Sequence, residues 1–289
     1  MNLLEVYNVS MWHVFGTEQP PAADTTFLQA AAEGIISNKH RKIQEDFNYW
    51  FMEALYSQPY TAYDNTLALP TGFKCEMRPV RALLFDTVNT YTTGTATRAG
   101  TTAVTGTGTG WLTEWTGKRY RISFDSGTTW YFINSVASSS SLTLESAGPT
   151  ATASAFIIQA CNSVVELDKQ GPGRSQLHGL DVLGYGDPAW YEIFDDTLSM
   201  YPLPQYDGQL EYRYYKYLPR PTVFATHTDD LTTEAADLLI YMTVAEIADS
   251  QGDDKKAAKY EEKAAQELGN LKKKHLHRTA ANFRTRYVE

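Results

Sequence analysis

The stretch TATRAGTTAVTGTGTGWLTEWTGKRYRI, residues 95–122, decides the predicted fold. Residues 92–110 contain nine threonines and five glycines, and four runs rich in β-branched and aromatic residues follow: KRYRISF, TTWYFINSV, SLTLES and SAFIIQA. Turn sequences such as Asp-Ser-Gly at 125–127 separate some of these runs. Threonine suits the pleat of a strand, and turn signals at this spacing are typical of a small sandwich or barrel. We therefore expect residues 92–159 to form an inserted all-β domain.

The segments on either side of this block predict helices. Apolar residues recur at helical spacing over residues 24–57, with Asp24 as a helix cap and Gln58-Pro59 as the stop. A second helical pattern covers residues 233–250, and Gly252 and Asp253 separate it from a third pattern that starts near residue 254. These last two patterns predict an αα-hairpin.

The predicted fold class is therefore α+β. A discontinuous core made of residues 1–91 and 160–289 would contain a long N-terminal helix, the C-terminal αα-hairpin and a few strands, such as QLEYRYYKYLP at 209–219. The all-β sandwich or barrel of residues 92–159 would be inserted into it. Residues 271–289 would form a separate basic arm.

The charge distribution is uneven along the chain. The net charge is −9, but residues 161–254 carry 17 acidic and 5 basic side chains, whereas residues 255–289 carry 10 basic and 4 acidic ones. This split predicts a tail that seeks an acidic surface, behind a body that repels polyanions. No window is apolar enough for a membrane span, so no membrane partner is expected.

The sequence offers no catalytic signature. It lacks HExxH, P-loop, EF-hand and GxSxG motifs, so we expect no catalytic residue, cofactor or metal. His275 and His277 follow three lysines and fit a basic arm better than a metal site. The acidic pairs at 195–196 and 229–230 fit loop or helix-capping roles. Four aromatic residues of the insert form either its core or a sugar-stacking platform: Trp111, Trp115, Trp130 and Tyr131.

Three stretches together resemble the head-to-tail adaptor (connector, neck) proteins of tailed bacteriophages. They are HRKIQEDFNYWFMEAL with YDNTLALPTGFKCEMRPVRALL, the passage from LEYRYYKYLP to KAAQEL, and the β-rich insert. The resemblance implies a non-enzymatic virion protein that forms a ring of twelve subunits between the portal and the tail tube or tail nozzle, extending the DNA channel. Duplex DNA would pass without tight binding. The protein would assemble in the host cytoplasm and lie in the virion neck. The insert departs from the minimal helical adaptors.

The resemblance also implies that a C-terminal segment reaches the portal. In this sequence the corresponding candidates are Lys272, Lys273, Lys274, Leu276, Arg278, Phe283, Arg284, Arg286 and Tyr287. Two other functions stay open. A carbohydrate- or receptor-binding tail or neck component would use the insert, although its loops are mainly Ser, Thr, Gly and Ala. A hydrolase would need a convergent acid–base set, and none is visible in the sequence.

Overall fold

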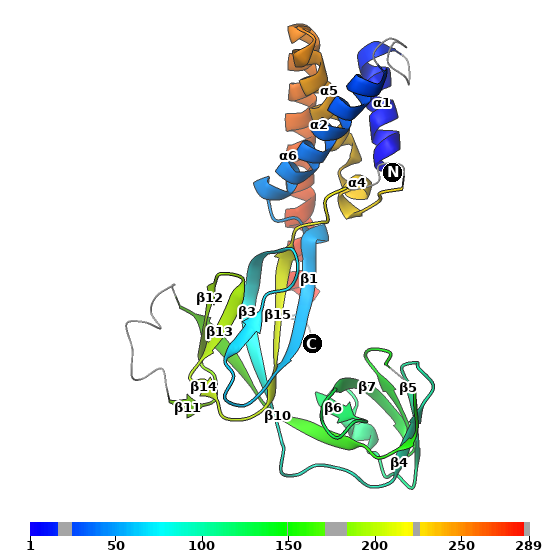
Figure 1. The fold of residues 1–289 in the computed structure, drawn as a ribbon, viewed down its shortest axis with the longest axis vertical. Coiled ribbons are helices and arrows are strands. Elements are labelled where there is room, and N and C mark those ends of the chain that lie inside the picture. Colours follow the sequence, from blue (N-terminus) through cyan, green and yellow to red (C-terminus); the bar gives the residue numbers. More distant parts are fainter. Residues whose placement is uncertain (17–24, 149, 171–183, 222–225, 286–289) are drawn as a thin grey trace. The chain divides into compact units, whose positions relative to one another are not determined.

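The computed structural model describes residues 1–16, 25–148, 150–170, 184–221 and 226–285, and for residues 25–31 and 278–285 it describes the backbone only. The chain divides into two compact units. The first contains Met1–Leu55, Pro70–Met77 and Arg213–Glu289, and the second contains Tyr56–Leu69 and Arg78–Tyr212. The α-helices belong to the first unit, and most of the strands belong to the second (Figure 1).

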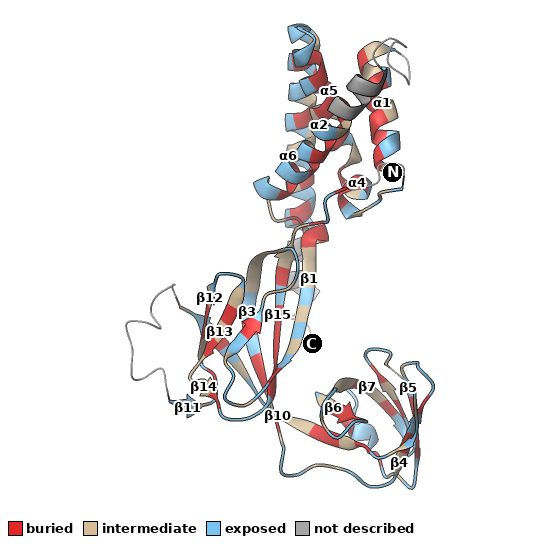
Figure 2. Ribbon diagram, in the orientation of Figure 1, coloured by how far each residue is buried: buried red, intermediate tan, exposed pale blue. Residues whose placement is uncertain are grey.

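The helical unit contains α1 (Leu3–Phe15), α2 (Thr25–Asp46), a 3-10 turn (Trp50–Met52), α4 (Asp230–Glu234), α5 (Ala236–Ser250) and α6 (Asp254–Thr285). A capping box begins α1, because Asn2 and Glu5 each accept a hydrogen bond from the other's backbone N–H. Figure 2 shows buried residues along α1, α2, α5 and α6. Their apolar side chains form one core. Within the described ranges, no helix combines the length and the apolar character needed to cross a membrane.

Two local predictions for the α5–α6 connection are confirmed. Gly252 adopts a left-handed conformation with φ of 74°, and the Asp253 carboxylate accepts a hydrogen bond from the backbone N–H of Lys256 at 3.1 Å. These two residues end one helix and begin the next by satisfying the backbone groups that a helix terminus leaves free.

The predicted fold class is wrong, because the structure is mainly β rather than a helical core with a few strands. Thirteen strands join in one sheet. They are β1 (Glu53–Tyr60), β2 (Thr66–Ala68), β3 (Phe73–Phe85), β4 (Thr95–Arg98), β5 (Ala103–Thr107), β6 (Tyr120–Ser123), β7 (Tyr131–Ser138), β8 (Ser141–Leu144), β9 (Ala151–Ser154), β10 (Ile157–Lys169), β12 (Trp190–Phe194), β13 (Thr197–Tyr201) and β15 (Gly208–Lys216). β11 (Tyr185–Gly186) and β14 (Leu203–Pro204) form a separate pair.

The long N-terminal helix is the clearest part of this error. The helix predicted to run to residue 57 ends at Asp46, and β1 begins at Glu53. Aromatic residues between these points happen to continue the helical spacing, and short apolar runs do not distinguish helix from strand by periodicity alone. Residues 53–60 form a strand because they pair with β15 in the sheet. Likewise, the many Gly, Pro and Asp residues of 170–209 predict long surface loops with one strand, AWYEIFDD, but the described part of this range contains both β12 and β13.

One strand joins the insert to the rest of the sheet. β10 pairs antiparallel with β6 over residues 157–160 and then with β3 over residues 161–167. Its last residues pair in parallel with the start of β12. The order along the main path is β1-β15-β3-β10-β6-β7-β8-β5-β4-β9, so the hydrogen-bond ladder is continuous.

The Thr/Gly-rich block forms β4 and β5. Burial alternates along β5, with Val104 and Gly106 facing inward and the threonines facing outward. The ring of Trp111 packs on Gly106, where an added Cβ would lie 2.8 Å from the ring carbon Cη2. The Trp111 side chain is 2% exposed and belongs to the apolar core of the insert. Threonine thus covers the outer face of the strands, and glycine makes room for the tryptophan beneath them.

Candidate functional site

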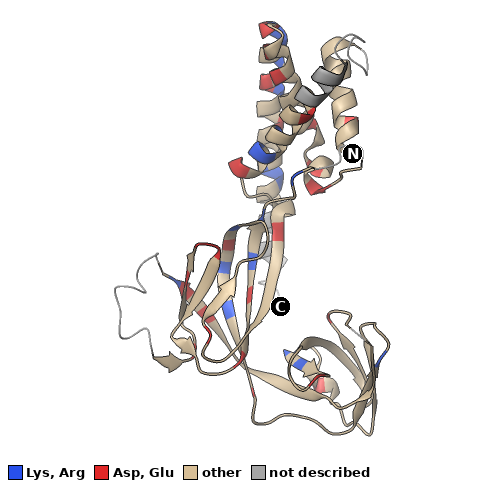
Figure 3. Ribbon diagram, viewed as in Figure 1, with Lys and Arg blue, Asp and Glu red and all other residues tan. Residues whose placement is uncertain are grey.

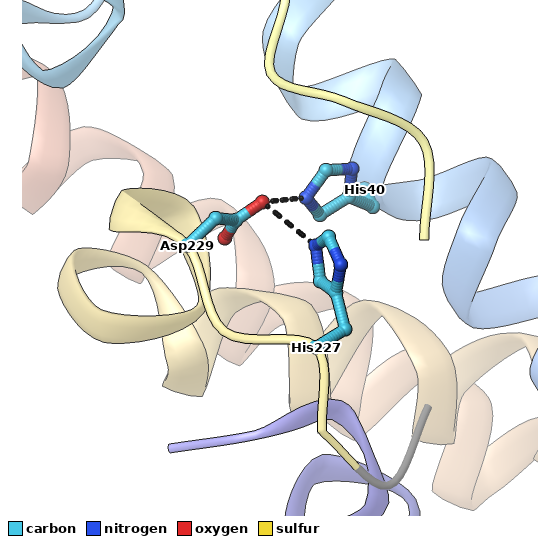
Figure 4. Close-up of side chains that lie close together, drawn as sticks. All are labelled: His40, His227 and Asp229. Carbon is cyan, nitrogen blue, oxygen red and sulfur yellow. Dashed lines mark hydrogen bonds and ion pairs between the residues drawn. The ribbon is translucent and has the colours of Figure 1, made fainter. Parts of the chain in front are cut away.

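Three titratable side chains, His40, His227 and Asp229, lie close together in the helical unit. His40 on α2 is 1% exposed, and its Nε2 lies 2.7 Å from Oδ2 of Asp229. His227 approaches the same oxygen through its own Nε2 at 3.2 Å. Figure 4 shows the two imidazole rings converging on this carboxylate. Oδ1 of Asp229 accepts from the backbone N–H of Thr232, so Asp229 also caps α4.

Neighbouring hydrogen bonds fix the tautomer of His40. Oε1 of Gln44 accepts from the backbone N–H of Leu218 at 2.6 Å, which leaves Nε2 of Gln44 facing Nδ1 of His40 at 3.0 Å. An amide nitrogen donates only, so Nδ1 of His40 accepts and its Nε2 carries the proton. His40 therefore donates to Asp229.

This arrangement fits a hydrogen-bonded clasp better than a metal centre. The three side chains have ligand atoms within 4.8 Å of one another, but a metal on Nε2 of His40 would require Nδ1 to carry the proton, opposite the donor Nε2 of Gln44. Burial raises the pKa of Asp229, but hydrogen bonds from His40, Thr232 and His227 lower it to about 2. The clasp joins α2 to the segment that precedes α4.

Sequence reasoning predicted a capping role for the Asp229 pair and missed the two histidines. Asp229 and His40 are 189 residues apart, and neither histidine belongs to a spaced motif. The other acidic pair forms the turn between β12 and β13, where Asp195 and Asp196 have φ of 46° and 59°. The predicted loop role of this second pair is therefore confirmed.

Most of the predicted C-terminal arm, residues 271–285, belongs to α6 and is not a separate segment. Lys272 forms an ion pair with Asp46 at 2.8 Å, and Lys274 forms one with Glu234 at 2.6 Å. Leu276 is 63% exposed, and Lys273 is also exposed. The side chains of Arg278, Phe283, Arg284, Arg286 and Tyr287 lie outside the described residues.

The two histidines of the arm have different environments. His275 is 7% exposed, and its ring lies 5.1 Å from that of Phe47 and 6.2 Å from that of Trp50, measured between centroids. Burial lowers the pKa of His275. His277 is exposed. The face of α6 that carries His275 packs into the helical unit. The chain is therefore held in place by packing as far as residue 275.

The four aromatic residues of the insert do not form a common platform. Trp111 and Trp115 are 2% and 7% exposed and contribute to the core. Trp130 and Tyr131 are partly buried, and each lies against an arginine: Arg121 is 4.1 Å from the Trp130 ring centroid and Arg98 is 4.3 Å from that of Tyr131. Figure 3 shows few charged residues on the strands of the insert.

The helical unit carries two separate apolar features. Trp12 and Leu4 on α1 are 56% and 36% exposed. A groove of about 730 Å³ lies between α2, α5 and α6. Ile43, Leu238 and Met242 are among its apolar lining residues. Charged residues line the groove as well, including the ion pair of Lys39 with Glu246.

Comparison with known families identifies the class of the protein. The model of the family described as SU10 adaptor protein matches residues 133–286, more than half of the chain. The chain belongs to the SU10 adaptor protein family. No curated protein matches the sequence.

The match extends from β7 to one residue beyond the end of α6. It therefore includes strands of both the insert and the remaining sheet, together with the C-terminal helices. The family makes the chain a structural adaptor protein of a bacteriophage virion, which confirms the expected class and points away from enzymatic activity.

Proposed function

We propose that this chain forms a homo-oligomeric ring, of twelve subunits, between the portal and the tail of a bacteriophage. The ring extends the DNA channel and attaches the tail tube or tail nozzle. It occupies the neck of the virion after assembly in the host cytoplasm. The observation that carries this proposal is the adaptor family match over residues 133–286.

The two apolar features of the helical unit support ring formation. Trp12 and Leu4 project from α1, whereas the groove is lined by residues of α2, α5 and α6. A ring needs two different, complementary surfaces on each subunit, because a head-to-tail contact repeats until it closes. In this proposal the Trp12 side of one subunit packs into the groove of the next, which would bury both apolar features.

The C-terminal arm is the proposed portal-binding element. Lys272 and Lys274 already form ion pairs within the unit, so Lys273 and Leu276 are the candidates with the freest side chains among the described residues. The sequence beyond them adds further candidates: Arg278, Phe283, Arg284, Arg286 and Tyr287. Basic residues would raise the association rate with an acidic portal surface, and aromatic anchors would set the lifetime of the complex.

Truncation tests this assignment. Removing residues 278–289 leaves Leu271 and His275, which pack into the helical unit, and so should preserve the fold. The truncated protein is expected to lose binding to heads that carry a portal but no tail. The substitution Lys118→Ala, on the insert, serves as a control that leaves the arm intact. Unchanged binding of the truncated protein would contradict the portal-binding role.

The acidic excess of residues 161–254 is proposed to face the DNA path in part. Lysine and arginine contacts to phosphates provide most of the affinity of DNA-binding proteins, and this segment has few basic residues. The assembled ring is therefore expected to bind duplex DNA weakly even at low salt. Tight binding in a gel-shift assay would contradict this part of the proposal.

A further inference from the structure

A small cavity in the strand-rich unit combines a buried arginine and two exposed aspartates with aromatic rings. It has a volume of about 300 Å³ and lies between the end of β1, the β6–β7 turn and the start of β15. Gly208 lies against the ring of Tyr60, and an added Cβ at Gly208 would also approach the backbone oxygen of Leu83 to 2.7 Å. Glycine at this position is what allows the Tyr60 ring to form part of the wall.

Arg121 supplies a cation to this cavity. Its side chain is 2% exposed, and the guanidinium lies 3.8 Å from the ring centroid of Phe85 and 4.1 Å from that of Trp130. Nε and Nη2 both donate to Oε1 of Gln159, at 2.9 and 2.7 Å. Nη1 makes no hydrogen bond to any described residue. Burial lowers the pKa of Arg121 to about 10, which leaves the group charged at neutral pH.

Two aspartates line the same cavity, and each has one carboxylate oxygen to spare. Oδ1 of Asp64 accepts from the backbone N–H and the hydroxyl of Thr66, at 3.0 and 2.9 Å. Oδ1 of Asp207 accepts from the backbone N–H of Ala62 at 2.7 Å. Within the described part of the chain, Oδ2 of each aspartate has no hydrogen-bond donor.

These charges select the chemistry of a ligand. The two carboxylates repel an anion, and the guanidinium repels a cation placed against Nη1, so a neutral group suits both parts of the wall. A hydroxyl group donates as well as accepts, so hydroxyls can bond both to Oδ2 of the aspartates and to Nη1 of Arg121. The Trp130 ring adds an apolar surface in the same wall.

We propose that this cavity binds a neutral, hydroxyl-rich ligand, namely a single sugar unit of a neutral polysaccharide. The aspartates accept hydrogen bonds from its hydroxyls, Arg121 donates to a hydroxyl or ring oxygen, and Trp130 contacts its C–H face. The volume matches the lower end of small-molecule sites. This site is independent of the proposed ring, so it can be tested on the purified full-length chain alone.

The ligand class is tested with sugars that differ only in charge. Glucose, galactose and mannose represent the neutral ligand, and glucuronate and glucosamine are the anionic and cationic counterparts. At least one neutral hexose should bind with a millimolar dissociation constant in ligand-observed NMR, and its charged counterparts should bind at least about fivefold more weakly. Absence of binding by all three neutral hexoses, or tighter binding of glucuronate or glucosamine, would overturn the proposal.

Substitutions locate the binding to this cavity. Asp64→Asn and Asp207→Asn keep the Oδ1 acceptor that holds the local backbone but replace Oδ2 by a donor, so each should weaken hexose binding at least about fivefold. Arg121→Gln should also weaken hexose binding at least about fivefold. Because Arg121 is buried, this variant could fail to fold, and the two asparagine variants then provide the test. Arg81→Gln removes a half-exposed arginine that pairs with Glu166 and should leave hexose binding unchanged. Unchanged binding by both asparagine variants would overturn the assignment.

Discussion

At the scale of the residue, Asp229 joins three parts of the helical unit through hydrogen bonds. It accepts hydrogen bonds from His40, His227 and the backbone of Thr232. Asp229→Asn should retain the helix cap, because asparagine caps as well as aspartate, but its amide nitrogen would face the protonated Nε2 of His40. Setting two donors against each other in a buried site should lower the free energy of unfolding by about 2 kcal/mol.

Chemical denaturation followed by circular dichroism measures this loss. Asp253→Asn is the matched control, since Asp253 caps α6 at a site where its side chain is 48% exposed. That substitution should change stability by only a few tenths of a kcal/mol. Equal losses in the two variants would mean that the histidine contacts of Asp229 contribute nothing.

The low pKa of Asp229 predicts a specific acid sensitivity. Its pKa is about 2 in the folded protein, against an ordinary value of 3.8, so ionised Asp229 stabilises the fold above pH 3.8, and this contribution disappears as the pH falls towards 2. The stability difference between the wild type and Asp229→Asn should therefore shrink by about 2 kcal/mol between pH 5 and pH 2. A difference that does not change over this interval would contradict the account of the clasp.

At the scale of the element, the β4–β5 block depends on glycine where Trp111 packs. Gly106→Ala would force a Cβ against the Trp111 ring and the Thr109 side chain, so it should destabilise the insert by about 2 kcal/mol. Gly269 lies in α6 with nothing within 4 Å of an added Cβ, and Gly269→Ala should instead stabilise the helix by about 1 kcal/mol. Denaturation followed by tryptophan fluorescence and by far-ultraviolet circular dichroism separates the two effects, and destabilisation by both variants would contradict the packing argument.

The two ends of the insert lie side by side, which makes its removal testable. Tyr91 and Ile158 exchange backbone hydrogen bonds of 2.9 Å in both directions. Replacing residues 92–157 by a two-residue Asn-Gly turn should therefore close a hairpin at this bridge and leave the helical unit folded. We expect the deletion variant to retain its helical circular dichroism signal and a cooperative transition. Loss of that transition would show that the insert is required for folding of the remainder.

Local chemistry predicted some elements well, and long-range pairing explains the failures. The cap at Asp253, the left-handed Gly252 and the β character of the Thr/Gly block each follow from a few neighbouring residues. The sequence predicts helix over the first part of β1, because the place of β1 beside β15 depends on residues about 150 positions away, as the hydrogen bond from Gln209 to Ser57 illustrates. The same separation hides the His40–Asp229 clasp, whose partners no local motif connects.

At the scale of the whole molecule, part of the positive charge near the C-terminus is already paired with acidic side chains in the structure. Some of the basic excess near the C-terminus is neutralised within the helical unit, since Lys272 and Lys274 pair with Asp46 and Glu234. The charge available to a partner is therefore smaller than the sequence predicts. If the remainder of the arm docks on an acidic portal surface, raising the salt concentration should slow association more than it speeds dissociation.

We propose that this adaptor assembles as a ring, and the mass of the assembled species tests this proposal most directly. Native mass spectrometry of the purified protein, alone and mixed with portal, should show a closed species near 390 kDa, the mass of about twelve chains of 32.4 kDa each. Ring formation only when portal is present would also agree with the account, because portal would then template the closure. A protein that stays monomeric at 32.4 kDa with and without portal would contradict it.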